Sequence, residues 1–353
     1  GGTDYYMPAV QHCWLVPYYP PLRNELLCDR VLKQGGDLRF GYEMVRLVHE
    51  GSTVRGAIFK TTAGYVEIDA QATLIATGGY PANAQMMRAL QTDACRVITA
   101  NSYNTFDDGS GIKAGMWAGA IKQADPTPML FDRGAVDPGV DAGYSIDAEG
   151  NPSLPGKIYQ LNWGSQPFLK VNREGERFAN ESTPYDNMLF ATERQPGGVF
   201  CQIFDSNAPA DVIRFNMIGC ASYSRMMMEQ GVPLDDFLSN EQLGFNVVKK
   251  ADTLDELADL LGFADKAKET FLATCEHYNE LYDAQQDTDY GKEAYRLSEL
   301  RTPPFYGCWY GASLLTTLDG LVIDSKMRVV DAAWRPIPGL YAAGDASGSF
   351  FNT

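Results

Sequence analysis

The feature that most constrains the fold is a pair of short strand-like segments of small apolar residues, each followed by glycine, at opposite ends of the chain. One is Thr73-Leu74-Ile75-Ala76, which runs into Gly78-Gly79, and the other is residues 339–343, which run into Gly344-Asp345. Residues 208–282, between them, have mainly helical periodicity. The sequence therefore predicts an α/β domain built from both chain ends, with a mixed insertion between them.

Local patterns predict the individual elements. Alternating apolar residues predict strands at residues 37–40, 44–48, 54–60, 65–68, 72–76, 321–323, 327–330 and 339–343. The uniformly apolar segment 72–76 is typical of a strand buried on both faces. Helices are predicted at residues 23–34, 83–91 and 111–120, with residues 18–21 non-helical and Thr253 as a helix N-cap. Residues 125–161 predict a long loop with short elements, and 287–289 a solvated surface.

Composition excludes several classes of protein. The 353 residues include 29 Lys and Arg against 45 Asp and Glu, a net charge of −16 that argues against nucleic-acid binding. No apolar run approaches the ~18 residues of a membrane span. The seven cysteines include no C-x-x-C, which favours free thiols and predicts no metal site. Because the chain opens on Gly1, either a leader was removed or this is an internal piece of a longer protein.

Three segments could contact a dinucleotide, and each has a plainer interpretation. The Gly78-Gly79 pair lets a ligand approach the backbone or simply forms a turn. Asp345 could accept hydrogen bonds from ribityl or ribose hydroxyls, or lie in a tight connection. The amides of Asp108-Gly109-Ser110-Gly111 could face a phosphate or begin a capped helix. No G-x-G-x-x-G follows an N-terminal strand.

Together these segments resemble a known family. The motifs that carry the resemblance, in chain order, are Ala76-Thr77-Gly78-Gly79-Tyr80, Asp108-Gly109-Ser110-Gly111-Ile112, Val171-Asn172-Arg173-Glu174-Gly175-Glu176-Arg177-Phe178-Ala179-Asn180-Glu181, Pro303-Pro304-Phe305-Tyr306 and Ile337-Pro338-Gly339-Leu340-Tyr341-Ala342-Ala343-Gly344-Asp345. Their order is similar to the flavoproteins of the fumarate reductase and succinate dehydrogenase group. The nearest branch is the soluble one, with flavocytochrome-type fumarate reductases, urocanate reductase and 3-ketosteroid dehydrogenases.

The resemblance implies a fold and a domain layout. The family fold is a Rossmann-like FAD-binding domain with an inserted α+β capping domain. The expected FAD-binding parts are residues 1–124 and 311–353, and the expected cap is residues 125–310. The family's glycine-rich turn would lie upstream of Gly1 and its last flavin-facing helix downstream of Thr353. The FAD domain is thus expected to be incomplete, and this chain alone is expected to bind FAD weakly or not at all.

The resemblance also assigns cofactor contacts, residue by residue. Met44 would touch the adenine through its backbone, and Asp345 would bind the ribityl chain or the pyrophosphate. Ser110 stands where the family usually has Asp. The full set implied to contact FAD is Met44, Ala76, Thr77, Gly78, Gly79, Asp108, Gly109, Ser110, Gly344 and Asp345.

The expected chemistry departs from fumarate reduction. In the family's fumarate reductases, an Arg shortly after Asn-Glu delivers the proton, and Tyr185 takes that position here. Leu161 and Gly164 occupy the places of the family's Glu and Arg proton relay. A phenol, with a reference pKa near ~10, can donate or accept a proton. Tyr185 is therefore the candidate acid, and the alternative is a packing residue whose hydroxyl merely finds a partner.

The expected substrate is not a C4-dicarboxylate. Asp125 and Thr316 replace two family histidines that attract carboxylates. The residues expected to contact substrate are Asp125, Gln160, Trp163, Thr316 and Thr317. The aromatic residues Tyr159, Trp163, Phe168 and Tyr310 could form an apolar wall for a ring-bearing substrate, or be core residues.

The preferred prediction is an FAD-dependent enzyme that reduces the C=C bond of an α,β-unsaturated carbonyl compound, with Tyr185 supplying the proton. The alternatives are a ketosteroid-type dehydrogenase working oxidatively, and a non-catalytic flavin or electron-transfer protein. A separate electron donor is expected, because no haem C-x-x-C-H and no iron–sulfur cysteine spacing occurs. The compartment, exported to the cell envelope or cytoplasmic, stays open.

Overall fold

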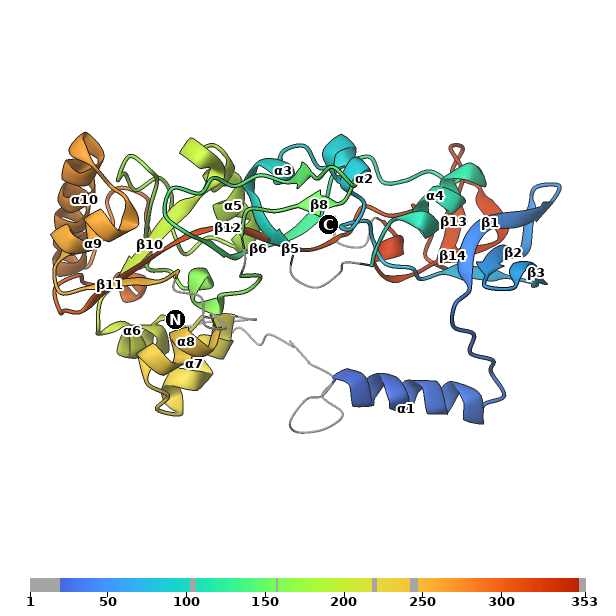
Figure 1. The fold of residues 1–353 in the computed structure, drawn as a ribbon, viewed down its shortest axis with the longest axis horizontal. Coiled ribbons are helices and arrows are strands. Elements are labelled where there is room, and N and C mark those ends of the chain that lie inside the picture. Colours follow the sequence, from blue (N-terminus) through green and yellow to red (C-terminus); the bar gives the residue numbers. More distant parts are fainter. Residues whose placement is uncertain (1–19, 102–105, 157, 218–220, 242–246, 349–353) are drawn as a thin grey trace.

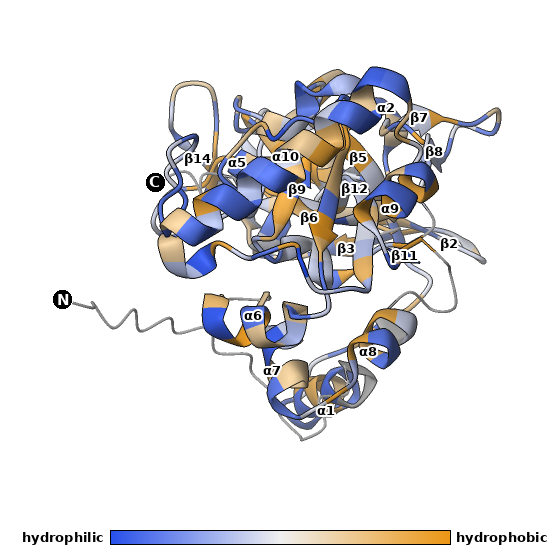
Figure 2. Ribbon diagram, turned by 90° about the vertical axis from the view of Figure 1, so that its left-hand side faces the viewer, coloured by the Kyte–Doolittle hydropathy of each residue, from blue (hydrophilic) through white to orange (hydrophobic). Residues whose placement is uncertain are grey.

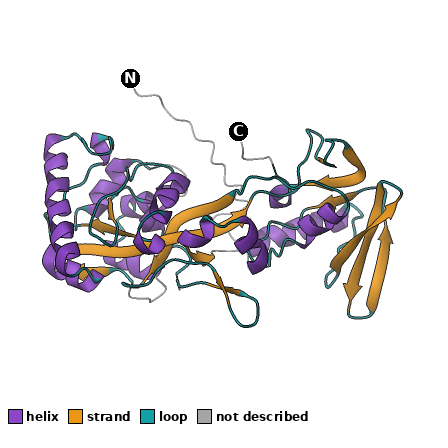
Figure 3. Ribbon diagram, turned by 90° about the horizontal axis from the view of Figure 1, so that it is seen from above, coloured by secondary structure: helices purple, strands orange, loops and turns teal. Residues whose placement is uncertain are grey.

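The protein is an elongated molecule in which helices and strands are mixed (Figure 1). The computed structural model describes residues 20–101, 106–156, 158–217, 221–241 and 247–348. Viewed from above, long central strands connect a helix-rich end to a three-stranded sheet at the other end (Figure 3). Within the described ranges, no helix combines the length and the hydropathy needed to cross a membrane.

Two small sheets form one end of the molecule. An antiparallel sheet has the order β1-β2-β3, and a second sheet has the order β13-β14-β4, with β14 and β4 parallel. The strands are β1 (Glu43–Glu50), β2 (Thr53–Thr61), β3 (Gly64–Asp69), β4 (Thr73–Ile75), β13 (Arg328–Val330) and β14 (Pro336–Ala342). The first and last parts of the chain thus meet in one sheet, as the sequence predicts.

A larger sheet is organised around β12. Its order is β11-β12-β10-β9, and β5 and β6 also pair with β12. The bounds are β5 (Ile98–Asn101), β6 (Pro128–Val136), β9 (Leu169–Val171), β10 (Phe200–Phe204), β11 (Lys249–Ala251) and β12 (Phe305–Thr317). Pairing with β10 and β11 uses the first part of β12, and pairing with β5 uses the last part. The predicted boundary at residue 310 falls inside this strand, and both domain boundaries stay a prediction.

Most helices lie along the central sheet or at the helix-rich end of the molecule, α4 packs against β1, and α1 lies apart from the sheets (Figure 1). Their bounds are α1 (Pro20–Lys33), α2 (Ala84–Leu90), α3 (Ala94–Val97), α4 (Ser110–Trp117), α5 (Tyr185–Glu193), α6 (Ala208–Phe215), α7 (Ser222–Glu229), α8 (Leu234–Glu241), α9 (Leu254–Leu261) and α10 (Asp265–Ala284). Short elements are β7 (Ser145–Ile146), β8 (Pro152–Ser153), η1 (Asn162–Ser165), η2 (Pro196–Gly198), η4 (Ala294–Arg296) and η5 (Gly344–Ala346). Hydrophobic residues concentrate on β5, β6 and β9 (Figure 2), because these strands are buried under the helices.

Most predicted strands and helices are confirmed, and Thr253 caps α9 by accepting a hydrogen bond from the N–H of Glu256 at 3.1 Å. Residues 37–40 form no strand, since no neighbouring strand of the described chain pairs with them. Helix α1 begins at Pro20, although residues 18–21 were predicted to be non-helical. A proline in the first helical turn loses no hydrogen bond, because the first N–H groups have no partner there.

Three further predictions need correction. The predicted loop at 125–161 contains the nine-residue strand β6, whose charged residues Asp132 and Arg133 are buried and form hydrogen bonds with residues far along the chain. In β4 only one face is covered, since Ile75 is buried and Leu74 is 58% exposed. Residues 321 and 323 make isolated bridges and not a strand.

Candidate functional site

Two parallel strands, β4 and β14, end at the same edge of their sheet. The backbone N–H of Ala343 donates to the carbonyl oxygen of Ile75 at 3.0 Å. The chain leaves β4 through the exposed residues Ala76-Thr77, and it leaves β14 through Gly344-Asp345. Ligands of α/β sheets bind outside the carboxyl ends of parallel strands. The structure thus brings these two predicted cofactor segments together at an edge suited to a ligand.

Glycine is required at positions 78 and 79, after β4, because other parts of the chain pack closely against the backbone there. Gly78 has a left-handed backbone (φ +73°), and a Cβ there would lie 2.5 Å from the carboxyl carbon of Asp107. A Cβ on Gly79 would lie 2.6 Å from the carbonyl oxygen of Thr317. The hydroxyl of Thr317 accepts a hydrogen bond from the N–H of Tyr80 at 2.9 Å. This turn is therefore clamped against the end of β12.

Two carboxylates at the same edge, Asp107 and Asp345, lie close enough to interact electrostatically. Burial raises the pKa of the Asp107 carboxyl, the negative charge of Asp345 raises it further, and a hydrogen bond from the Gly79 N–H opposes both. Asp345 accepts a hydrogen bond from the hydroxyl of Thr316 at 2.8 Å. Such crowded carboxylates gain from hydroxyl donors supplied by a ligand. Sequence reasoning missed Asp107, although two consecutive aspartates before Gly109 could have indicated it.

The segment before α4 forms its own capping structure. The carboxylate of Asp108 accepts a hydrogen bond from the Ser110 N–H at 2.8 Å, and Gly109 adopts the left-handed conformation (φ +72°) as N-cap. The plainer interpretation, a capped helix start, thus describes this segment. Met44 is the second residue of β1, where it is half-buried opposite Phe59 of β2. Contacts of these residues with FAD stay predictions.

The predicted substrate residues near this edge have different exposures. Thr316 and Thr317 are buried at the end of β12. Asp125 is exposed, and its carbonyl oxygen accepts a hydrogen bond from the hydroxyl of Thr127 at 3.3 Å. Thr127 in turn accepts the N–H of Leu318 at 2.8 Å, which fixes the Asp125 loop beside the end of β12.

Tyr185 lies at the start of α5, directly after Pro184. Proline fixes φ and often precedes or opens a helix, so it sets where this helix begins. The half-buried Tyr185 ring meets the ring of Phe131 edge-on, with 5.4 Å between centroids. The guanidinium of Arg133 lies 5.3 Å from the centre of the Tyr185 ring and donates to its hydroxyl at 3.4 Å. Sequence reasoning missed Arg133, because β6 was not predicted.

Strands β6 and β12 connect the surroundings of Tyr185 with the carboxylates at the ends of β4 and β14. Phe131, which contacts Tyr185, lies opposite Ser313 on β12. Thr316, which donates to Asp345, lies three residues further along the same strand. At ~3.3 Å per residue this separation is about 10 Å. This spacing separates Ser313 from Thr316 along β12, and whether Tyr185 and the strand-end carboxylates act in one site stays a prediction.

Leu161 and Gly164 provide no proton-carrying side chain. Leu161 is fully buried, and its N–H donates to the carbonyl oxygen of Arg133 at 2.9 Å. A Cβ on Gly164 would lie 2.8 Å from the ring of Tyr310, so no larger side chain fits there without movement. The absence of a fumarate-type relay stays a prediction.

The predicted aromatic wall is mostly core. Trp163 is fully buried and stacks on Phe168 with 5.7 Å between ring centroids. Tyr159 is 55% exposed and Gln160 is half-buried on the segment leading into η1. The core interpretation holds for Trp163 and Phe168, and substrate contacts by Gln160 and Trp163 stay predictions.

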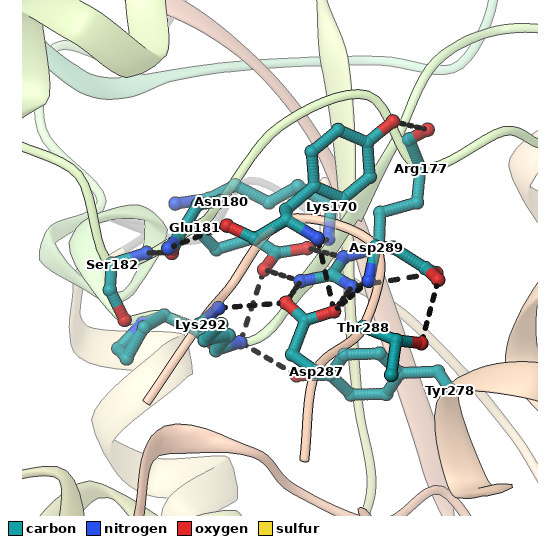
Figure 4. Close-up of polar contacts among 12 residues, drawn as sticks. Lys170, Arg177, Asn180, Glu181, Ser182, Tyr278, Asp287, Thr288, Asp289 and Lys292 are labelled. Carbon is teal, nitrogen blue, oxygen red and sulfur yellow. Dashed lines mark hydrogen bonds and ion pairs between the residues drawn. The ribbon is translucent and has the colours of Figure 1, made fainter. Parts of the chain in front are cut away.

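A buried ion-pair cluster holds the loop that leads to Tyr185 (Figure 4). Arg177 contacts Glu181 at 2.9 Å and Asp287 at 2.7 Å, and Lys292 contacts Glu181 at 3.2 Å. Burial lowers the pKa of Lys292 to about 8, against the opposing charge of Glu181. Although burial raises the pKa of Asp287, the Arg177 guanidinium holds it well below its usual range. The prediction of a solvated surface at 287–289 is wrong for Asp287, whose charge is neutralised by residues distant in sequence.

Comparison with known proteins identifies relatives over nearly the whole chain. The family described as "FAD binding domain" matches residues 24–353. Vinyl phenol reductase of Lactiplantibacillus plantarum is 30% identical over 296 residues, covering 80% of this chain and 55% of that protein. Fumarate reductase (cytochrome) of Shewanella frigidimarina is 27% identical over 331 residues, covering 92% of this chain and 49% of that protein.

A solved structure shows the same fold. The 3-ketosteroid delta1-dehydrogenase from Sterolibacterium denitrificans, in complex with 1,4-androstadiene-3,17-dione, aligns with a TM-score of 0.64 and 21% identity over 92% of this chain and 57% of that one. The chain spans about half the length of the curated relatives it matches. The mixed helix–sheet fold is therefore that of FAD-binding flavoproteins.

Proposed function

Because the chain belongs to the FAD-binding domain family of fumarate reductase-like flavoproteins, we propose that it is part of an oxidoreductase that reduces a C=C bond conjugated to a carbonyl group. The substrate is not a C4-dicarboxylate. The observation that carries this proposal is the position of Tyr185, a half-buried phenol at the start of α5 that packs on Phe131 of β6, the strand paired with the end of β12 where Thr316 contacts Asp345.

The strand-end residues fit FAD. Asp107 and Asp345 are crowded carboxylates that can accept hydrogen bonds from the ribityl and ribose hydroxyls. The exposed backbone of Ala76-Thr77 leaves room for a ligand at the edge of the sheet. When bound and reduced, FAD would supply the hydride from its N5 position. In this proposal, residues 1–124 and 311–353 belong to a Rossmann-like FAD domain, and residues 125–310 belong to the cap.

Tyr185 supplies the proton in this proposal. Hydride addition to one carbon of the C=C bond leaves negative charge on the other carbon, and the Tyr185 hydroxyl protonates it. Leu161 has no proton to give and Gly164 has no room for a side chain, which supports an acid different from the family's arginine.

The substrate class follows from the side chains around the site. Asp125 adds an exposed negative charge where the family has a histidine, which disfavours a dianionic substrate. The edge-on ring of Phe131 beside Tyr185 favours a substrate with an apolar or aromatic group next to its C=C bond. The name of the vinyl phenol reductase relative supports an aromatic substrate. Electrons would come from a separate donor.

The test is a turnover assay with the full-length protein and a chemical reductant. Fumarate, an enone and an aryl acrylate are compared for the wild type, Tyr185→Phe and the control Tyr65→Phe, a 73% exposed tyrosine of β3. The enone or aryl acrylate should be reduced, and Tyr185→Phe should lower kcat by about 10²-fold or more while Tyr65→Phe does not. Preferred turnover of fumarate, or full activity of Tyr185→Phe, would overturn the proposal.

The same assay separates the alternatives. Faster oxidation of a ketosteroid than reduction of any C=C substrate would favour the dehydrogenase. FAD uptake with no substrate able to reoxidise the reduced flavin would favour a non-catalytic flavin protein.

A further inference from the structure

Strand β6 places a buried arginine directly beside Tyr185. Arg133 is 1% exposed, and its guanidinium lies between two aromatic rings, 4.6 Å from the centre of Phe131 and 5.3 Å from that of Tyr185. A guanidinium removed from water is costly unless a carboxylate neutralises it. Among the described residues, no ion pair involves Arg133.

A chain of hydrogen bonds fixes this guanidinium in place. Its Nε donates to the hydroxyl of Ser165 at 2.7 Å, and that hydroxyl donates to a carboxylate oxygen of Asp132 at 2.5 Å. The other carboxylate oxygen of Asp132 accepts from Lys170 at 3.2 Å. Each of these side chains is almost fully buried. Asp132 is therefore neutralised by Lys170 and reaches Arg133 only through a hydroxyl.

In the described part of the chain, one buried cation beside this site lacks a carboxylate partner. Lys170 is also close enough to Glu181 to feel its charge, so the Arg177 cluster and the β6 residues form one electrostatic group. Within that group the cations are Arg133, Lys170, Arg177 and Lys292, and the carboxylates are Asp132, Glu181 and Asp287. Each of these three carboxylates has a direct cationic partner other than Arg133. Arg133 is thus the buried cation of the group without a direct carboxylate partner, and it contacts the phenol.

Building on the proposed function, we infer that Arg133 is a positioning residue that makes Tyr185 an effective acid. When the O–H bond of Tyr185 breaks, the proton forms a C–H bond with the substrate carbanion, and the negative charge moves to the phenol oxygen. The hydride has come from reduced FAD, which is oxidised in the same cycle. The Arg133 guanidinium then neutralises the phenolate, which regains its proton from solvent because the side chain is only half-buried.

The other charged groups near Tyr185 do not replace Arg133. On α5 itself, burial and the charge of Asp132 raise the pKa of Asp186. From α3, Arg96 is paired with Glu193 at the far end of α5 at 2.8 Å. Strand β12 has no charged residue, and neither does η2. Arg133 is thus a cation held directly at the Tyr185 hydroxyl, where it can stabilise a phenolate.

The first test needs no substrate, so it is independent of the proposed function. Tyrosinate absorbance of the full-length protein is titrated with pH, and the Tyr185 contribution is taken as the difference from the matching Tyr185→Phe protein. Arg133→Gln should move this contribution to higher pH by about one unit or more. The control Arg173→Gln, which removes an arginine lying 5.1 Å over the ring of Trp309 and paired with Asp141, should leave it unchanged.

The second test is the pH dependence of kcat. The alkaline limb, where Tyr185 loses its proton, should move upward in Arg133→Gln, and the plateau kcat should fall about ten-fold. If Arg133→Gln does not fold, Arg133→Lys replaces it in both tests, with a smaller shift in the same direction because the shorter side chain withdraws its charge. An unchanged Tyr185 titration in the variant that folds would overturn the inference, whatever the enzyme's substrate proves to be.

Discussion

Lys292 and Glu181 form an ion pair at 3.2 Å in which neither side chain has any exposed surface. Glu181 also contacts Arg177 at 2.9 Å, so one carboxylate is held by two cations. This pair ties the loop before Tyr185 to the segment after α10. Buried pairs of this kind contribute little net stability as a unit, yet losing one partner leaves an uncompensated charge.

We expect Lys292→Met to lower the free energy of unfolding by about 3–5 kcal/mol, because Glu181 loses one of its two cations and the Tyr278 hydroxyl loses a donor. Urea denaturation followed by circular dichroism measures this loss. Lys266→Met, which removes an exposed lysine paired with Glu269, is the control and should stay within about 0.5 kcal/mol of the wild type. Equal stabilities of the two variants would contradict a structural role for the cluster.

The same lysine predicts a dependence of stability on pH. Burial lowers the pKa of Lys292 to about 8, whereas an unfolded lysine has a pKa near ~10.4. Between these values the unfolded chain binds more protons, so the contribution of Lys292 to the unfolding free energy rises with pH. The stability gap between wild type and Lys292→Met should therefore widen between about pH 8 and pH 10, by at most ~1.4 kcal/mol per pH unit. A gap that narrows over this range would show that Lys292 is not desolvated.

Gly79→Ala should destabilise the turn after β4. Its Cβ would lie 2.6 Å from the carbonyl oxygen of Thr317, so either the turn or the end of β12 must shift. We expect a loss of roughly 1–3 kcal/mol in unfolding free energy. Thr317→Val, which removes the acceptor for the Tyr80 N–H without adding bulk at the turn, should cost about 1 kcal/mol. An unchanged denaturation midpoint for Gly79→Ala would show that the space between position 79 and the Thr317 carbonyl oxygen accommodates a methyl group.

Asp345→Asn should weaken FAD binding by the full-length protein about ten-fold, because a neutral amide accepts hydroxyl hydrogen bonds less strongly than a carboxylate. Removing the charge should also lower the pKa of Asp107, which Asp345 raises. Flavin fluorescence quenching gives the dissociation constant. Asp236→Asn, an exposed position on α8, serves as the control. Equal dissociation constants for FAD in the two variants would show that Asp345 does not bind the cofactor.

The parts of the fold that follow local rules could be predicted from the sequence. Strands β1 to β3 alternate in hydrophobicity between glycine turns, and Thr253 has the residue type and spacing of an N-cap. Two strand-like segments that run into glycine, at opposite ends of the chain, indicated a domain built from both ends, and β4 does pair with β14.

Strand β6 could not be predicted from the sequence, and for that reason Arg133, which lies on it, was not predicted as part of the site. Asp132 and Arg133 interrupt its apolar pattern, which locally indicates a loop. Their burial is possible because Lys170 and Ser165, more than thirty residues later in the chain, supply a counter-charge and a bridging hydroxyl. No short window of sequence contains that information. Tyr185 was found only because a motif places it, and its arginine partner lay outside any motif.

The continuity of β12 has a practical consequence. From Phe305 to Thr317 it is one uninterrupted strand, hydrogen-bonded on one stretch to β10 and β11 and on the next to β5. Cutting the chain at residue 310 would split this strand and leave unpaired backbone N–H and C=O groups on the strands of each fragment. We expect the fragments 1–310 and 311–353 to aggregate when they are expressed separately and to reassociate when they are expressed together. The protein is therefore a candidate for fragment complementation and a poor candidate for expression as separate domains.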